Sequence, residues 1–254
     1  MRSTAVALPW PCSRLRGTFM VMCGRFAMDK NTDDLIEEFV AVGGDFRDWR
    51  PGWNIRPTDR IAVVLESMTD APEPVRRLEL ARWSLTPNWS KTLKMKISTF
   101  NARSEGITEK ASFRVAIRSQ RALIPVTGYY EWQTDEVTKK KKTPFYLRAP
   151  ANESLAFAGI YSWWKDHSLA DDDPGLWTLT TTILTADSVP RLAHIHDRNP
   201  VLLPRDLWTD WLDPHIEGTQ HFVDATVAAA HPVADSLTIV ELASVTDVEP
   251  IARG

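Results

Sequence analysis

Short apolar runs bounded by turn residues constrain the fold of this chain more than any other feature of its sequence. They are rich in β-branched and aromatic side chains and are separated by Pro, Gly, Asp and Asn, which is typical of β-strands. We predict strands at 23–28, 61–65, 77–83, 122–126, 129–133, 144–148, 155–164, 177–184 and 238–242. Capping residues and helical spacing predict helices after 31–34, within 104–117, at 188–193 and at 205–212. Many strands with few helices indicate a mixed, strand-rich α+β domain.

Composition excludes several classes of protein. At 254 residues and 43% hydrophobic content, the chain can bury a full core as one large domain or two small ones. The formal net charge of −3 gives no global basic field, so any nucleic-acid contact must come from a local patch. The two cysteines, Cys12 and Cys23, argue against a disulfide framework or a cysteine zinc site. No apolar run reaches the length of a membrane span. We therefore expect a cytoplasmic monomer without metal or cofactor, nucleoid-associated in a bacterium.

Residues 1–21 do not have the pattern of a secretory signal. Their apolar stretch is short, is interrupted by Pro9 and Pro11, and is followed by Arg14 and Arg16. The segment is either a disordered tail or the result of a start codon assigned too early. We favour translation from Met22, and we interpret 22–254 as the domain.

The segment Met22-Cys23-Gly24-Arg25-Phe26 has an unusual reactivity if Met22 is the initiator and is removed. Cys23 then carries a thiol and an α-amine on adjacent carbons, and an aldehyde can condense with both to form a thiazolidine. Near neutral pH the free-base fraction of an α-amine exceeds that of lysine by about two to three orders of magnitude. The alternative is a small buried cysteine in a first strand, as most free cysteines are.

A second cluster places two histidines, a carboxylate and a guanidinium within 194–198. His194 and His196 could ligate a metal, but no soft ligands lie nearby in the sequence. We interpret His196 as a general acid or base. The alternative is a pair of structural or surface histidines.

Glu131 stands in an aromatic strand, and strand alternation places it on one face with Tyr129 and Gln133. A carboxylate among aromatic rings loses solvation, which raises its pKa and suits proton transfer. The alternative is a solvent-facing glutamate between two core aromatics.

Asn101 and Arg103 also share a strand face, and a guanidinium is a good bidentate partner for phosphate. The alternative is an N-cap and a surface arginine. Further candidates for nucleic-acid contact are Trp53, Trp83, Trp89 and Trp132 for base stacking and Arg25, Arg47, Arg50 and Arg56 for phosphates. Core tryptophans with surface arginines would look the same. We interpret the lysine run 139–142 as a solvated hairpin tip.

The motifs together are more specific than any one of them. In chain order they are MCGRF (22–26), WNIRPT (53–58), WSLTP (83–87), NARSE (101–105), IPVTGYYEW (124–132), AGIY (158–161), TILT (182–185) and HDRNP (196–200). This ordered set resembles the SRAP (SOS response-associated peptidase) family, which processes abasic sites. The resemblance extends from Met22 to about Pro250.

The resemblance implies a curved, barrel-like mixed sheet with peripheral helices and a basic groove for DNA. It implies that the initiator methionine is removed and that Cys23 cross-links to the ring-opened aldehyde of an abasic site in single-stranded DNA. Asn101 and Arg103 would hold the opened sugar and its phosphates. Glu131 would assist ring opening and imine chemistry, and His196 would transfer protons and support reversal. We add Arg25, Arg56, Trp53, Trp83 and Arg198 as DNA-binding candidates.

Two positions depart from the usual family pattern. Asn199 stands where the family usually has Met, and Ala122 stands where it often has Cys. Two other functions remain open: a thiol peptidase acting on other proteins through Cys23 and His196, and a non-covalent reader of single-stranded or modified DNA.

Overall fold

The structure is a computed structural model that describes residues 24–39, 41, 49–68, 72–135, 137–138, 140–151, 153–246 and 248–250. The predicted leader, Met22, Cys23 and Arg47 lie outside these residues.

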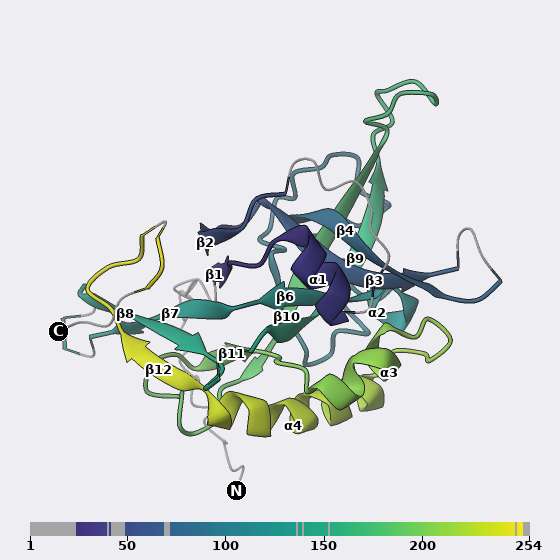
Figure 1. The fold of residues 1–254 in the computed structure, drawn as a ribbon. Coiled ribbons are helices and arrows are strands. Elements are labelled where there is room, and N and C mark those ends of the chain that lie inside the picture. The colour runs from purple at the N-terminus through teal and green to yellow at the C-terminus, as the bar shows by residue number, and fades with distance from the viewer. Residues whose placement is uncertain are drawn as a thin grey trace, which may run out of the picture.

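Five strands close a mixed barrel, which confirms the predicted strand-rich α+β class (Figure 1). They are β3 (Arg60–Ser67), β4 (Val75–Trp83), β6 (Arg121–Val126), β9 (Leu155–Lys165) and β10 (Trp177–Asp187). The strands pair in the ring order β10-β4-β3-β6-β9, and β9 returns to β10. The β10–β4 pairing is parallel and the other four are antiparallel. Closure removes the sheet edges that would otherwise need protection.

Two short strands extend the barrel at β10, beyond the part of β10 that pairs with β4. β5 (Asn101–Arg103) pairs with β10 in parallel, and β11 (Arg198–Pro200) pairs with β10 antiparallel. Both β5 and β11 carry predicted site residues. The end of β10 therefore brings the NARSE and HDRNP motifs together from distant parts of the chain.

A second, antiparallel sheet has the order β12-β8-β7-β1-β2. Its strands are β1 (Arg25–Met28), β2 (Gly52–Ile55), β7 (Gly128–Thr134), β8 (Lys142–Arg148) and β12 (Thr238–Glu241). β6 of the barrel leads into β7 through Thr127, whose backbone N–H donates to the carbonyl of Ala27 at 2.8 Å. Gly128 begins β7, where an added Cβ would lie 2.5 Å from the Tyr146 ring and 2.7 Å from the Leu147 oxygen.

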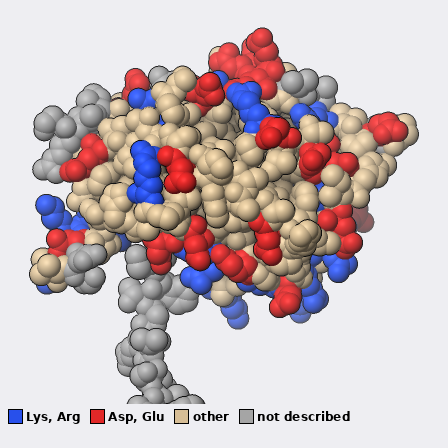
Figure 2. Space-filling view, turned by 90° about the horizontal axis from the view of Figure 1, so that it is seen from below, with Lys and Arg blue, Asp and Glu red and all other residues tan. Residues whose placement is uncertain are grey.

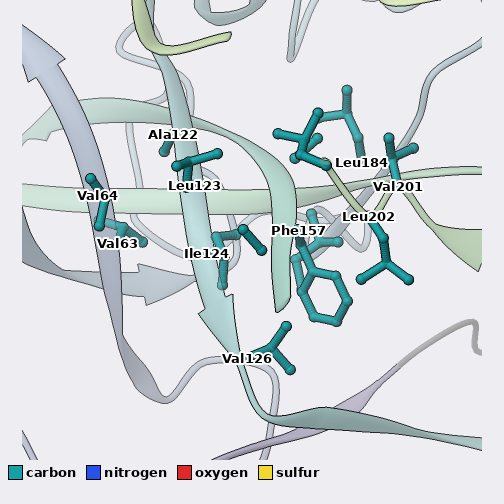
Figure 3. Packing of buried hydrophobic residues seen from close by; sticks show 14 of the residues in the cluster. Val63, Val64, Ala122, Leu123, Ile124, Val126, Phe157, Leu184, Val201 and Leu202 are labelled. Carbon is teal, nitrogen blue, oxygen red and sulfur yellow. The ribbon is translucent and has the colours of Figure 1, made fainter. Parts of the chain in front are cut away.

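Buried aliphatic side chains fill the barrel, as Figure 3 shows for part of the cluster. Val63 and Val64 of β3, Leu123 and Ile124 of β6, and Phe157 of β9 are fully buried. Such consecutive apolar residues are typical of strands covered on both faces. Ala122, one of the two departures from the family pattern, is also fully buried and is therefore a core position.

Helices are few and lie at the periphery (Figure 1). α1 (Thr32–Phe39) follows Asn31, whose Oδ1 accepts from the Asp34 backbone N–H at 3.0 Å. α2 (Ala116–Ser119) is short, and α3 (Trp208–Leu212) continues from the 3₁₀ turn η1 (Arg205–Leu207). Within the described residues no helix combines the length and apolarity needed to cross a bilayer.

Two helix predictions need correction, and one helix was missed. The longest helix of the described residues, α4 (Gln220–Ser236), was not predicted; its N-cap is Thr219, whose Oγ1 accepts from the Phe222 backbone N–H. Its alanine run gives little periodic signal, and Pro232 within it is read as a helix breaker. Residues 188–193 form turns instead of a helix, and most of 104–117 does the same, with α2 covering its end.

A buried arginine joins the barrel to α3 and the loop before α4. Arg121 is fully buried, and its guanidinium donates to the backbone carbonyls of Ile117, Arg118, Trp211, Asp213 and Ile216. Burial lowers the pKa of Arg121 to about 10, so the group still carries its charge at neutral pH. Figure 2 shows the face seen from below, the side on which α4 lies, where acidic and basic side chains are interspersed.

Candidate functional site

A cavity of about 380 Å³ gathers several of the predicted site residues. It is lined by Gly24, Arg25, Arg56, Pro57, Phe100, Glu131, Trp132, Thr134, Lys142 and His196. These residues come from β1, the loop after β2, β7, β8 and the segment before β11. Five predicted residues (Arg25, Arg56, Glu131, Trp132 and His196) thus line one space, although they come from separate parts of the sequence. Gly24, the residue after Cys23, also lines it.

One face of β7 accounts for the position of Glu131. Tyr129 Oη donates to Asn199 Oδ1 at 2.5 Å, and Gln133 Nε2 donates to the His194 carbonyl at 3.0 Å. Tyr129, Glu131 and Gln133 share this face because strand residues alternate. These two contacts hold β7 against the chain on either side of His196, at Asn199 and at His194. Glu131 lies between Tyr129 and Gln133 on β7 and is buried, with 3% exposed. Because β7 runs through Gly128–Thr134, the predicted common face is present, and the Glu131 on it is buried instead of solvent-facing.

His196 is held in one orientation. Its ring is buried, and Nδ1 accepts from the backbone N–H of Arg198 at 3.0 Å. An accepting Nδ1 leaves the proton on Nε2 in the neutral ring. Among the described residues, Nε2 is buried without a hydrogen-bond partner. The structure thus presents a neutral imidazole with an Nε2–H available to a bound molecule.

The neighbouring carboxylate of Asp197 acts to raise the pKa of His196. Asp197 Oδ1 also lies 3.0 Å from His196 Nδ1, and this contact favours the imidazolium. The Asp197 side chain is 74% exposed, so water screens its charge. Burial is the larger effect and lowers the pKa of His196 below its ordinary value, which keeps the ring neutral at neutral pH.

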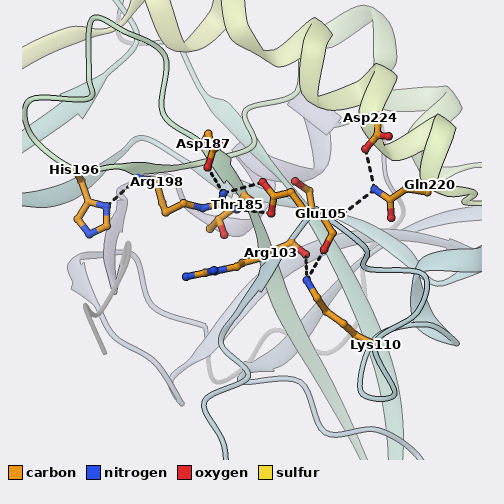
Figure 4. A network of polar contacts seen from close by, with 10 residues as sticks. Arg103, Glu105, Lys110, Thr185, Asp187, His196, Arg198, Gln220 and Asp224 are labelled. Atoms are coloured by element: carbon orange, nitrogen blue, oxygen red, sulfur yellow. Dashed lines mark hydrogen bonds and ion pairs between the residues drawn. The ribbon is translucent and has the colours of Figure 1, made fainter. Parts of the chain in front are cut away.

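Arg198 is held inside a polar network that fixes the HDRNP segment (Figure 4). Its guanidinium donates to both carboxylate oxygens of Glu105 at 2.7 and 2.8 Å, to Asp187 at 2.5 Å and to the Thr185 carbonyl at 2.8 Å. Only 8% of the side chain is exposed. We correct the predicted DNA contact accordingly: Arg198 joins β11 to β5 and β10, and its backbone N–H orients His196.

Asn101 and Arg103 lie on β5, in register with Ile183 and Thr185 of β10. The backbone carbonyl of Arg103 accepts from Lys110 Nζ at 2.9 Å, while Figure 4 shows its guanidinium pointing away from Lys110 and from the carboxylates around Arg198. Asn101 is half-buried and does not line the cavity, although its neighbour Phe100 does. The shared strand face of Asn101 and Arg103 is as predicted.

The two tryptophans predicted to bind DNA differ in exposure. Trp83 is fully buried, and its Nε1 donates to the Phe100 carbonyl at 2.8 Å. It has no exposed face for a base, so we correct its role to packing behind Phe100. Trp53 is half-buried, and its carbonyl accepts from Tyr130 Oη at 2.6 Å.

Lys142 and Thr134 were not identified from the sequence. They face each other as the last register pair of the β7–β8 hairpin, and both line the cavity. Lys142 belongs to the lysine run interpreted as a solvated hairpin tip. The register of the hairpin was the signal that could have placed Lys142 in the strand, opposite Thr134, apart from the lysines that precede it. Arg25 lies over the Trp132 ring, with Cζ 5.5 Å from its centroid, as a cation–π contact. Across the described residues, no three His, Cys, Asp or Glu side chains gather as a metal site would require.

The fold and the cavity define a strand-rich barrel domain with a buried carboxylate and a neutral histidine facing one space. Comparison with known proteins identifies the family to which this fold belongs. The SRAP family model, described as SOS response associated peptidase, matches residues 22–245. The abasic site processing protein YoaM of Bacillus subtilis is 34% identical over 194 residues, which cover 76% of this chain and 80% of that protein.

More distant relatives and solved structures extend the comparison. The abasic site processing protein HMCES of Xenopus tropicalis is 29% identical over 229 residues, covering 76% of this chain and 66% of that protein. A crystal structure of a Bacteroides thetaiotaomicron protein superposes with a TM-score of 0.70 at 21% identity, covering 87% and 92% of the two chains. A phage-related protein from Bordetella bronchiseptica gives 0.62 at 25% identity, covering 87% and 95%. The chain belongs to the SRAP family.

Proposed function

We propose that this chain captures abasic sites in single-stranded DNA as a covalent thiazolidine on Cys23, after Met22 has been removed by the protein itself. The cavity carries this proposal, because Gly24, the residue after Cys23, lines the same space as Glu131 and His196. Family membership and the names of the relatives support it. The family match begins at Met22, which supports 22–254 as the functional domain.

The chemistry follows from the two nucleophiles of an N-terminal cysteine. The α-amine attacks the C1′ aldehyde of the opened sugar, the carbinolamine loses water, and an imine forms. The thiol then adds to the imine carbon, and its proton passes to the nitrogen. The product is a thiazolidine, with one water released overall. Ring closure is intramolecular, so proximity gives it a high effective molarity.

Two groups lining the cavity suit the proton transfers. Glu131 is assigned to ring opening, in which the C1′ hydroxyl loses a proton and the ring oxygen gains one. The Nε2–H of neutral His196 is assigned a hydrogen bond to the oxygen that leaves as water during imine formation. The proton that completes this water comes from the carbinolamine nitrogen, which is left as the imine, so the histidine stabilises the departing oxygen without placing a second positive charge in the site.

Positive side chains around the opening suit a DNA backbone. Arg25, Arg56 and Lys142 line the cavity, and Arg103 is exposed on β5. We assign phosphate contacts to these groups and sugar contacts to Asn101. Half-buried Trp53 is kept as a candidate base contact. An unpaired strand fits the proposal because an unstacked site needs no flipping energy.

The test is incubation of protein translated from Met22 with single-stranded DNA that carries one abasic site. We expect a band shifted on a denaturing gel, and intact-mass analysis should place Cys23 at the N-terminus and show the adduct mass minus water. Cys23→Ser should lose the stable adduct, and Glu131→Gln should slow its formation. Absence of any covalent product at neutral pH with a confirmed N-terminal Cys23 would reject the proposal.

A peptidase activity is the second candidate, since the family is described as a peptidase family. We confine it to removal of Met22 and assign the cleavage to the same cavity. A peptide panel left intact, while Met22 is lost from purified protein without added aminopeptidase, would support this assignment. Cleavage of unrelated peptides that depends on Cys23 would favour a general peptidase. A non-covalent reader would be favoured by a different result: the wild type forms no covalent product, and Cys23→Ala binds abasic DNA as tightly as the wild type does.

A further inference from the structure

A second cavity, of about 480 Å³, borders the same turn as the first. Arg56 and Pro57 line the first cavity, whereas Thr58 and Arg60 line the second. Consecutive Cα atoms are only about 3.8 Å apart, so the two cavities are separated by the width of this turn. The remaining lining residues of the second cavity are Glu79, Leu80, Arg82, Trp163, Pro174, Gly175, Trp177, Thr178 and Leu179.

The turn between the two cavities is held in a strained conformation. Thr58 has φ of 80°, which is costly for a residue with a branched side chain. Its backbone N–H donates to the Trp83 carbonyl at 2.8 Å, and the Trp83 N–H donates to the Asp59 carbonyl at 2.9 Å. Asp59 Oδ2 accepts from the Arg56 N–H at 2.8 Å. β4 and the turn's own hydrogen bonds thus keep both cavities in a fixed relation.

Two exposed indoles stand at the second cavity. Trp163 is 41% exposed and Trp177 is 51% exposed, on the hairpin of β9 and β10 that rises at the top of Figure 1. The strands pair Trp163 with Leu179 and Lys165 with Trp177, so both indoles and the lysine share one sheet face. Lys165 Nζ lies 5.9 Å from the Trp177 ring centroid. Diagonal neighbours across a sheet are within reach of each other when they are aromatic.

Cationic groups border these indoles. Arg60 and Arg82 are direct cross-strand partners on β3 and β4, so two positive charges lie side by side in the lining of this cavity. Burial lowers the pKa of Arg82, so the guanidinium lies in a partly desolvated position where an anion would stabilise it. Glu79 is the acidic group in the lining.

The hairpin tip beyond the indoles is acidic, and three of its carboxylates have local partners. Asp166 accepts from Ser168, Asp171 pairs with Lys165 at 2.9 Å, and Asp173 accepts from the Gly175 N–H. These charges repel a phosphate backbone, so a bound strand would cross the arginines and stop short of the tip.

We propose that the second cavity is a nucleotide subsite for the strand whose abasic site occupies the first cavity, and this rests on the proposed function. A base one or more nucleotides from the reacting sugar stacks on Trp163 or Trp177, and a phosphate lies against Arg60 and Arg82. Exposed aromatics beside guanidinium groups are the usual means of holding unpaired nucleotides without sequence preference.

The test measures non-covalent binding, so that it does not depend on cross-linking. Protein translated from Met22 with Cys23→Ala is titrated with fluorescent single strands that carry one abasic site. One series is extended only on the 5′ side and the other only on the 3′ side, and affinity is read by anisotropy. In one series the affinity should rise by roughly 5- to 150-fold when the strand reaches the second cavity, as the stacking of one base gives.

Trp163→Ala with Trp177→Ala should remove that rise and leave the shortest strands unaffected. Arg118→Gln is the matched control: it removes one exposed positive charge, and Arg118 lines neither cavity. Equal length dependence in the double variant and its parent would overturn the proposal. Circular dichroism checks the folding of the double variant.

A second measurement uses the parent protein alone. Strands with 5-iodouracil at successive positions are photo-cross-linked, and mass spectrometry should map one position to Trp163 or Trp177. Mapping of every position to other segments would also overturn the subsite. Failure of wild-type protein to form any covalent adduct would reject the proposed function without deciding these binding results.

Discussion

Replacing either partner of the buried Tyr129–Asn199 hydrogen bond should lower the free energy of unfolding. Replacing both partners should restore most of that loss. Tyr129 is fully buried and Asn199 is 7% exposed, and their hydrogen bond of 2.5 Å joins β7 to the segment that carries His196. The family resemblance leads us to expect Met at position 199, and in this chain Asn199 instead supplies the acceptor for the Tyr129 hydroxyl. A Met at this position would offer Tyr129 no comparable acceptor.

The magnitude follows from the cost of stranding one buried polar partner. Tyr129→Phe leaves Asn199 Oδ1 without its donor. Asn199→Met removes the acceptor of the Tyr129 hydroxyl and also the Nδ2–H that donates to the Pro200 carbonyl at 3.1 Å, a bond that the double variant does not restore. Each change should lower the free energy of unfolding by about 1–3 kcal/mol, whereas apolar replacement of both partners is often nearly neutral. Independent effects would sum to about 2–6 kcal/mol, but we expect the double variant to lie within about 1 kcal/mol of wild type.

Urea unfolding of the four proteins measures the coupling, and single-turnover cross-linking to abasic DNA measures its consequence for the site. Because the contact orients the segment that holds His196, both single variants should cross-link more slowly and the double variant should recover. A double variant as destabilised as the sum of the singles would refute the reasoning, since the hydrogen bond would then not connect the two residues energetically. If the double variant recovers its stability but not its cross-linking rate, the hydrogen bond has a role in positioning His196 beyond its role in folding.

Three further predictions test the fold and the histidine. Arg121→Met should lower the free energy of unfolding by at least about 3 kcal/mol in urea titrations, because five backbone carbonyls lose their donor. The pKa of His196 is lowered by burial, so the unfolded chain takes up the proton first as the pH falls below about 6.5. Stability should therefore decline from that pH down to the lower folded pKa, and His196→Gln should flatten this part of the profile. Gly128→Ala should destabilise the protein strongly in thermal melts, since the new Cβ would overlap Tyr146 and a backbone oxygen, and an unchanged melting temperature would contradict that packing.

Local pattern was enough to locate most strands and to mark candidate site residues. Alternation along β7 put Tyr129, Glu131 and Gln133 on one face, and the structure has them there. Closely spaced polar residues, such as those of HDRNP, marked candidates because residue type and spacing are written directly in the chain. The same local reasoning failed at α4, where alanines and Pro232 conceal a helix that is stabilised by packing on the domain.

Which candidates face one another depended on how distant strands pair. The sequence determined the strand-rich class, the shared strand faces and the reactive potential of Cys23, since these follow from neighbouring residues alone. Tertiary structure decided that His196 and Glu131 line one cavity, that Lys142 joins them, and that Arg198 and Trp83 are buried. The physical reason is that burial and charge pairing arise only when strand pairing brings together segments that are distant in the sequence, such as those that carry Glu105 and Arg198.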